Sequence, residues 1–210
     1  MKKKLIGVYN PSIILTYIGV ACSLFGIMML MGVGLDGSID TMRIAMIMLV
    51  IAGVCDMFDG TVARMCKRTE QEKEFGVQLD SLADVVSFGV FPACILIKMA
   101  SRVNIYTYII AFFYIFSGIM RLGWFNVTTE ENKGFYQGLP ITFSAIIFPV
   151  LYIVFRLLKV DFWMSFCFEV AYMVVSYLFI KNFKMKKMGI KMCIALAVVS
   201  IGAIVALCLF

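Results

Sequence analysis

Long apolar runs, separated by short polar segments, are the main pattern along this chain. Seven such runs cover about residues 12–33, 42–66, 76–99, 104–126, 139–158, 161–181 and 191–209. A membrane-spanning helix needs about 20 mostly apolar residues, and the alternating strands of about ten residues that are typical of a membrane β-barrel do not occur. The pattern predicts an all-α polytopic bundle of about seven transmembrane helices. We expect residues 1–210 to form a single integral-membrane domain.

Composition supports a membrane protein and restricts its chemistry. Hydrophobic residues make up 62% of the chain and charged residues 15%, with a mean hydropathy of +0.97. Soluble domains contain about 45–50% apolar and about 25% charged residues. Histidine is absent, which excludes imidazole metal ligands and histidine bases. The seven cysteines are scattered singly, without zinc spacing, which favours buried free thiols over disulfides.

Basic residues predict the orientation of the bundle. The chain starts with MKKK before its first apolar run, as a signal peptide would. That run exceeds the apolar core of about 7–15 residues in signal peptides and no clear cleavage site follows, so we expect an uncleaved first span. Most of the 19 basic residues lie on the side of the N-terminus, around positions 2–4, 64–73, 121–133 and 181–191. The positive-inside rule then predicts a cytoplasmic N-terminus.

Four aspartates interrupt the facing ends of the second and third runs. Asp56 and Asp59 are three residues apart, and Asp80 and Asp84 are four apart, so on helices each pair projects from one face. The polar segment MCKRTEQEKEF between the pairs can reverse the chain and bring them together. Acids inside a membrane usually mark a functional site, although pairing with nearby basic side chains is the structural alternative.

Four carboxylates at one end of a helix pair repel one another unless cations compensate their charge. Mg²⁺ and Mn²⁺ prefer oxygen ligands, and two such ions suit phosphoryl chemistry. Gly60 and Ala63 share the face of the first acid pair, and small residues leave room for phosphates. The sequence therefore favours a site for two Mg²⁺ or Mn²⁺ ions. A divalent-cation transporter is the alternative, but its acids would be distributed across the membrane depth.

The acids and their neighbours resemble a known family. The pattern D-x2-D-G-x2-A-R-x11-G-x3-D-x3-D, which runs from Asp56 to Asp84, is similar to the signature of the CDP-alcohol phosphatidyltransferases. The eleven-residue gap is longer than in most members and resembles the phosphatidylserine synthase branch. The segments LDSLADVVSFGVFPA, MRLGWFNV, GFYQGLPI and AYMVVSYLFIKNFK also resemble that branch. The resemblance covers roughly residues 8 to 187 and does not place the last apolar run.

This resemblance implies an enzyme that transfers the phosphatidyl group of CDP-diacylglycerol to L-serine and releases CMP at the cytoplasmic face. It implies two Mg²⁺ or Mn²⁺ ions held by Asp56, Asp59, Asp80 and Asp84. Asp84 would also be the general base for the serine hydroxyl. CDP-diacylglycerol would contact Gly60, Ala63 and Arg64. Family members are commonly homodimers, and the same chemistry with glycerol 3-phosphate or inositol phosphate is the alternative.

Other polar residues are weaker candidates. Arg121 and Asn126, at the inner end of the fourth run, are candidates for binding serine, with a snorkelling arginine as the alternative. Candidates for further contacts to CDP-diacylglycerol are Asn10, Thr16 and Thr69. As alternatives, Asn10 starts a helix before Pro11 and Thr69 is a plain turn residue.

Three further expectations concern Glu169 and the membrane around the protein. Glu169, an isolated intramembrane acid, is expected to face the bundle or a dimer contact. The basic loops suit anionic membrane lipids rather than nucleic acid. Because no organellar targeting segment is recognisable, we expect the plasma membrane of a bacterium.

Overall fold

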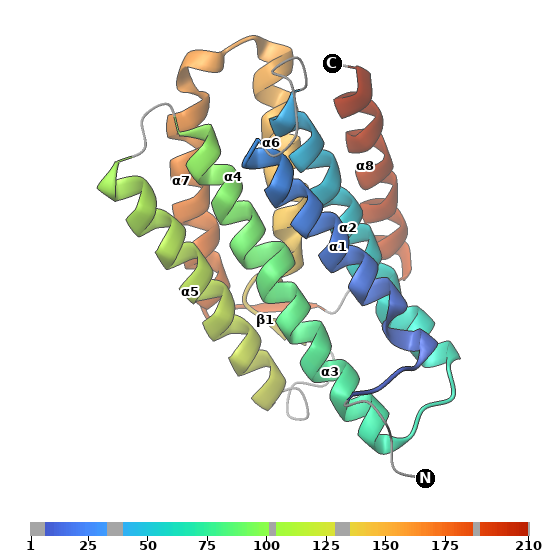
Figure 1. Cartoon of the computed structure of the whole chain (residues 1–210). Helices are drawn as coiled ribbons and strands as arrows, with labels where there is room; N and C mark the ends of the chain where they lie inside the picture. Colours follow the sequence, from blue (N-terminus) through green and yellow to red (C-terminus); the bar gives the residue numbers. More distant parts are fainter. Residues whose placement is uncertain (1–6, 33–39, 101–103, 129–134, 187–189, 210) are drawn as a thin grey trace.

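The computed structural model describes residues 7–32, 40–100, 104–128, 135–186 and 190–209. Its elements are η1 (Pro11–Ile13), α1 (Ile14–Leu30), α2 (Thr41–Met65), α3 (Glu70–Asp84), the π-helical η2 (Val85–Val90), α4 (Phe91–Met99), α5 (Ile105–Thr128), β1 (Phe135–Gln137), η3 (Ile141–Phe143), α6 (Ser144–Leu158), α7 (Asp161–Ile180), β2 (Lys184–Lys186) and α8 (Ile190–Leu209). The helices form one elongated bundle (Figure 1). The basic residues 2–4 used to predict orientation lie outside the described residues.

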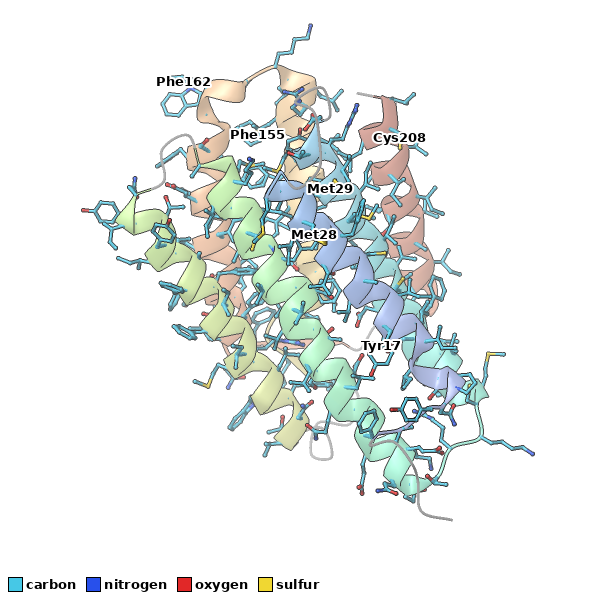
Figure 2. The ribbon with its side chains drawn as sticks, viewed as in Figure 1. Tyr17, Met28, Met29, Phe155, Phe162 and Cys208 are labelled. Atoms are coloured by element: carbon cyan, nitrogen blue, oxygen red, sulfur yellow. The ribbon has the colours of Figure 1, made fainter. Side chains whose placement is uncertain are left out.

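Seven helical segments of the described chain are long and apolar enough to cross a membrane. They match the seven apolar runs, which confirms the predicted all-α polytopic bundle. The third segment is longer than expected, because α3, η2 and α4 form one continuous helix over residues 70–99. Many large apolar side chains cover the outside of the bundle, as for Tyr17, Met28 and Phe162, which are 52%, 51% and 86% exposed (Figure 2).

The reversal between the two acid pairs is shorter than the sequence suggested. Most of the segment MCKRTEQEKEF is helical, and only residues 66–69 connect α2 to α3. Thr69 and Glu72 explain the early helix start, because they form a capping box. The Thr69 hydroxyl accepts a hydrogen bond from the Glu72 backbone N–H at 3.3 Å, and the Glu72 carboxylate accepts one from the Thr69 N–H at 2.8 Å. Such a box satisfies two backbone donors that a helix start leaves free.

Aromatic side chains fix the continuous third helix against α5 and α7. Pro92 has no N–H to donate to the Phe88 carbonyl one turn earlier. The buried Tyr114 hydroxyl on α5 donates to that carbonyl at 2.7 Å, and the Tyr172 hydroxyl on α7 donates to the Pro92 carbonyl at 2.6 Å. Tyr172 also stacks on Phe148 of α6, with ring centroids 3.9 Å apart. These contacts place α5, α6 and α7 relative to the helix that carries Asp84.

The segments after α5 and α7 are tied together by a short antiparallel pair, β1 with β2. Gly138 follows β1 with a φ of +71°, and its N–H donates to the Phe183 carbonyl at 2.9 Å. A side chain there would meet the Phe179 carbonyl at 2.6 Å, so only glycine fits. The GLP sequence, residues 138–140, therefore forms the turn into the fifth span.

Two polar residues outside the acid cluster have structural partners. Asn10 caps the helix that begins at Pro11, because its side chain accepts a hydrogen bond from the Ser12 N–H at 3.0 Å. Glu169 on α7 accepts a hydrogen bond from the Thr107 hydroxyl of α5 at 3.0 Å. Thr107 is fully buried. The expectation that Glu169 faces the bundle is therefore confirmed.

Candidate active site

The four predicted acids converge at one end of the α2–α3 helix pair. Carboxylate oxygens of Asp56, Asp80 and Asp84 lie within 4.8 Å of one another. Asp59 is not part of this close group, but its side chain comes within hydrogen-bonding reach of Asp80, as that of Asp56 does with Asp84. Asp59 and Asp84 are each only 9% exposed. The i, i+3 and i, i+4 spacings thus assemble the acids as predicted, with three in the tight cluster and Asp59 beside it.

The helix widens immediately after the last acid. Asp84 ends α3, and the π-helical turn η2 begins at Val85. Single π-turns inside α-helices are frequently found at functional sites. The acids precede this turn, whereas Phe88 within the turn and Phe91 directly after it are buried in the core with 1% and 0% exposure. The π-turn therefore separates the polar part of the helix from its packed part.

All four acids line a cavity of about 650 Å³. Helices distant in sequence close it, since α2, α3, α5, α6 and α8 all contribute lining residues. The polar lining beside the acids comes from Gly60, Thr61, Arg64, Ser81, Arg121 and Asn126. An acid cluster that opens into a roomy cavity with cationic and amide groups can bind a ligand that carries phosphates.

The two residues predicted at the inner end of α5 are both in this cavity. Arg121 is 8% exposed and lies over the Phe125 ring at 5.6 Å, and its charge attracts Asp56. Asn126 donates a hydrogen bond to the Ser81 hydroxyl at 2.8 Å, and Ser81 donates to the Val77 carbonyl at 3.1 Å. The position of Asn126 beside α3 is therefore fixed by a short polar chain.

Thr16 reaches the acids from the opposite side. Its hydroxyl donates to Asp59 at 3.2 Å. It lines a second, water-sized recess of about 10 Å³, which lies between α1 and the acid cluster and also touches all four acids. Thr16 thus contacts a predicted metal ligand rather than the large cavity.

The remaining predicted residues do not meet in the cavity. Asn10, Ala63 and Thr69 are absent from the described lining of both the cavity and the recess. Asn10 donates to the Lys67 carbonyl at 3.3 Å, and Thr69 is the cap of α3. The expected helix start accounts for the position of Asn10, whereas Thr69 caps α3 and is not a plain turn residue. Contacts of these residues with a ligand stay predictions.

Gly60 is left without close neighbours by the fold itself. A Cβ added there would meet only the Arg64 guanidinium, at 4.0 Å, whereas a Cβ at Gly53 on the same helix would meet Ala145 at 2.5 Å. The helix also tolerates alanine better than glycine. Packing against neighbouring side chains therefore does not account for the glycine at position 60, which leaves free space at the cavity wall.

We expect the Gly60→Ala variant to fold with unchanged or slightly raised thermal stability and to bind a phosphate-bearing ligand of this cavity about tenfold or more weakly, because the added methyl group fills free space beside the acids. Thermal unfolding in detergent and the ligand dissociation constant measure the two effects. Gly53→Ala is the matched control for stability, and it should lower the unfolding temperature instead. Equal ligand dissociation constants for wild type and Gly60→Ala would contradict this role.

Sequence reasoning missed the wall that α8 supplies. Cys193, Leu196 and Ser200 line the cavity, although the last apolar run carries no charged residue beyond its start. Their spacing of three and four residues places them on one helix face. That spacing is the one signal in the sequence that could have grouped them, but it does not say what they face.

Comparisons with known proteins agree with the acid pattern. A family model described as CDP-alcohol phosphatidyltransferase matches residues 9–180. The chain is 36% identical over 119 residues to an archaetidylserine synthase of Methanothermobacter thermautotrophicus. It is 36% identical over 115 residues to a CDP-diacylglycerol–serine O-phosphatidyltransferase of Saccharomyces cerevisiae and 31% identical over 156 residues to one of Helicobacter pylori.

These alignments cover only parts of both chains. They include 57%, 50% and 69% of this chain, and 49%, 40% and 63% of the three relatives in the same order. The chain thus spans about half the length of the curated relatives it matches. The family match, in contrast, includes both acid pairs and every helix from α1 to α7.

Proposed function

Because the chain belongs to the CDP-alcohol phosphatidyltransferase family, we propose that it transfers the phosphatidyl group of CDP-diacylglycerol to L-serine and releases CMP. The observation that carries this proposal is the meeting of three carboxylates within 4.8 Å in a cavity of about 650 Å³. The choice of serine is supported by the names of the relatives from Saccharomyces cerevisiae and Helicobacter pylori.

The acid cluster fits hard divalent cations. Its ligand atoms are all carboxylate oxygens, which Mg²⁺ and Mn²⁺ prefer, and no histidine is present anywhere in the chain. The residues that would hold two ions are Asp56, Asp59, Asp80 and Asp84. When bound, the ions would neutralise the charge of the diphosphate and the negative charge that develops on the departing CMP.

Asp84 is suited to accept the proton of the serine hydroxyl. It is nearly buried at the top of the cluster and lines the cavity. As its carboxylate takes the proton, the serine oxygen bonds to the phosphorus that carries diacylglycerol. The bond from that phosphorus to the oxygen bridging to CMP breaks, and CMP leaves with the electron pair. A positioned carboxylate is needed because a serine hydroxyl is a weak nucleophile at neutral pH.

The donor would lie with its nucleotide beside Gly60 and Arg64 and its diphosphate at the acids. Arg64 is exposed at the end of α2, where its guanidinium donates to the Thr61 hydroxyl at 3.1 Å. We place this end at the cytoplasmic face of a bacterial plasma membrane, with the N-terminus inside, since basic residues gather there. Water-soluble serine then arrives from the cytosol while the lipid comes from the bilayer. We further propose one domain, assembled as a homodimer.

Arg121, which lines the same cavity as the acids, is proposed to bind the serine carboxylate. We expect Arg121→Lys to raise the KM for serine about tenfold, because lysine cannot make the bidentate contact of a guanidinium. The donor KM should change less than twofold. A raised donor KM with an unchanged serine KM would instead assign Arg121 to the diphosphate.

The acceptor is tested directly with purified protein, CDP-diacylglycerol and Mn²⁺. L-serine, glycerol 3-phosphate and inositol phosphate are supplied one at a time, and CMP release is followed. We expect serine to give the highest rate. CMP release with either phosphorylated alcohol but not with serine would refute the serine assignment while leaving the family chemistry in place.

A further inference from the structure

The cavity continues past the acid cluster. Along α2 its lining ends at Val50, which precedes Asp56 by six residues or about 9 Å of α-helix. Along α8 it runs from Cys193 to Ser200, or about 10 Å. The part away from the acids is formed mainly by Val50, Gly53, Ala145, Ile146 and Leu196. We name this part the apolar arm.

The inner face of α8 changes its role along the helix. Ala203 and Leu207 are buried, with 7% and 1% exposure, where α8 packs along α2 and α6 (Figure 1). On the same face, Leu196 and Ser200 line the apolar arm. The end of α8 distant from the acids therefore closes against the bundle, and its first half forms the wall of a hollow.

The opposite side of the arm is closed by tight packing between α2 and α6. A Cβ at Gly53 would lie 2.5 Å from the Ala145 side chain, so the two helices approach without a gap there. Val50, above Gly53, is only 1% exposed. The arm is thus a slot bounded by α2, α6 and α8. Of these three helices, α8 lies outside the residues matched by the family model, which end at residue 180.

An apolar slot that continues a charged site fits an amphiphile. Water is poorly accommodated among apolar side chains, because it needs two to four polar partners. The nucleotide and serine are polar and fit the acid end, whereas an alkyl chain gains free energy with each methylene it buries. The geometry points to α8 as the wall of a binding site for one fatty acyl chain of the lipid donor, with Leu196 and Ser200 limiting chain length. This inference rests on the proposed function.

This inference is tested by placing a large side chain inside the apolar arm and comparing the effect with that of the same side chain placed outside it. Leu196→Trp fills the arm, and Val198→Trp places the same side chain on the outer face of α8, where Val198 is 63% exposed. Ser200→Leu is a milder second variant inside the arm. Thermal unfolding identifies any variant that fails to fold, and Ser200→Leu then carries the test.

The readout is the dependence on donor chain length, from dibutanoyl to dipalmitoyl CDP-diacylglycerol in one detergent. We expect kcat/KM of the wild type and of Val198→Trp to rise with chain length. Relative to the dibutanoyl donor, Leu196→Trp should lose about tenfold with dipalmitoyl donor, equivalent to about two fewer buried methylenes. The same length profile in Leu196→Trp, Ser200→Leu and Val198→Trp would overturn the inference.

Donor binding without acceptor, measured by protection against thermal unfolding, separates this inference from the proposed function. Length-dependent donor binding without serine turnover would refute the serine transfer and support the arm. Serine turnover with no effect of Leu196→Trp on chain length would refute the arm alone. A wild-type protein that binds no CDP-diacylglycerol would refute both.

Discussion

Replacement of Asp84 by asparagine is expected to lower kcat by about a thousandfold, within the range of about 10²–10⁴ that general-base catalysis contributes. Asparagine keeps the shape of the side chain and one oxygen ligand, but it cannot take the proton of the serine hydroxyl. Asp84 lies in the three-acid cluster and its helix continues into the π-turn. We expect donor binding to persist, so kcat falls far more than donor affinity.

Asp40→Asn is the matched control for this experiment. Asp40 caps α2 at the far end of the helix, where it accepts a hydrogen bond from the Arg43 N–H at 3.1 Å. Asparagine caps helices as well as aspartate does, so turnover should stay at the wild-type level. Turnover of Asp84→Asn within tenfold of the wild type would refute the role of Asp84 as the base.

Removal of divalent cations is expected to abolish turnover, and Mn²⁺ or Mg²⁺ should restore it. The reason is that Asp56, Asp80 and Asp84 place like charges within 4.8 Å, facing a cavity that would receive a diphosphate. Asp80→Asn should raise the Mn²⁺ concentration for half-maximal activity by about tenfold or more, since one charged ligand is lost. Binding of Mn²⁺, measured by loss of the free-ion paramagnetic resonance signal, should weaken in parallel.

Glu169→Gln is the control, because it removes an intramembrane carboxylate that lies outside the acid cluster. Glu169 bonds Thr107 between α5 and α7 and does not line the cavity. Its Mn²⁺ dependence should match the wild type. Full turnover of wild type in the presence of excess chelator, or equal Mn²⁺ binding by wild type and Asp80→Asn, would contradict the metal assignment.

The architecture could be predicted because bilayer thickness and helix geometry act locally on the sequence. Apolar runs of one span each can satisfy their backbone groups in lipid only as helices. The meeting of the acid pairs was also predictable, because the short polar segment MCKRTEQEKEF between them can reverse the chain. Sequence spacing did not reveal that Asp59 stands apart from the tight cluster, since that depends on rotation of α2 against α3.

Contacts between distant helices decide the rest of the site. The Thr16–Asp59 bond joins residues 43 apart, and the Asn126–Ser81 bond joins residues 45 apart. No local pattern predicts which faces of α1 and α5 meet the acids. The π-turn after Asp84 likewise has no clear sequence signal, although Pro92 marks the region where the ordinary hydrogen-bond pattern is interrupted. The wall from α8 arises only when the whole bundle is assembled.

The central claim is that serine, at the acid cluster, receives the phosphatidyl group directly from CDP-diacylglycerol. Product stoichiometry in one reaction tests it, with purified protein, CDP-diacylglycerol, Mn²⁺ and isotopically labelled L-serine analysed by mass spectrometry. The predicted result is one CMP and one labelled phosphatidylserine for each donor consumed, with both formed about a thousandfold more slowly by Asp84→Asn. CMP accompanied by phosphatidic acid, or by a lipid that lacks the serine label, would contradict the account.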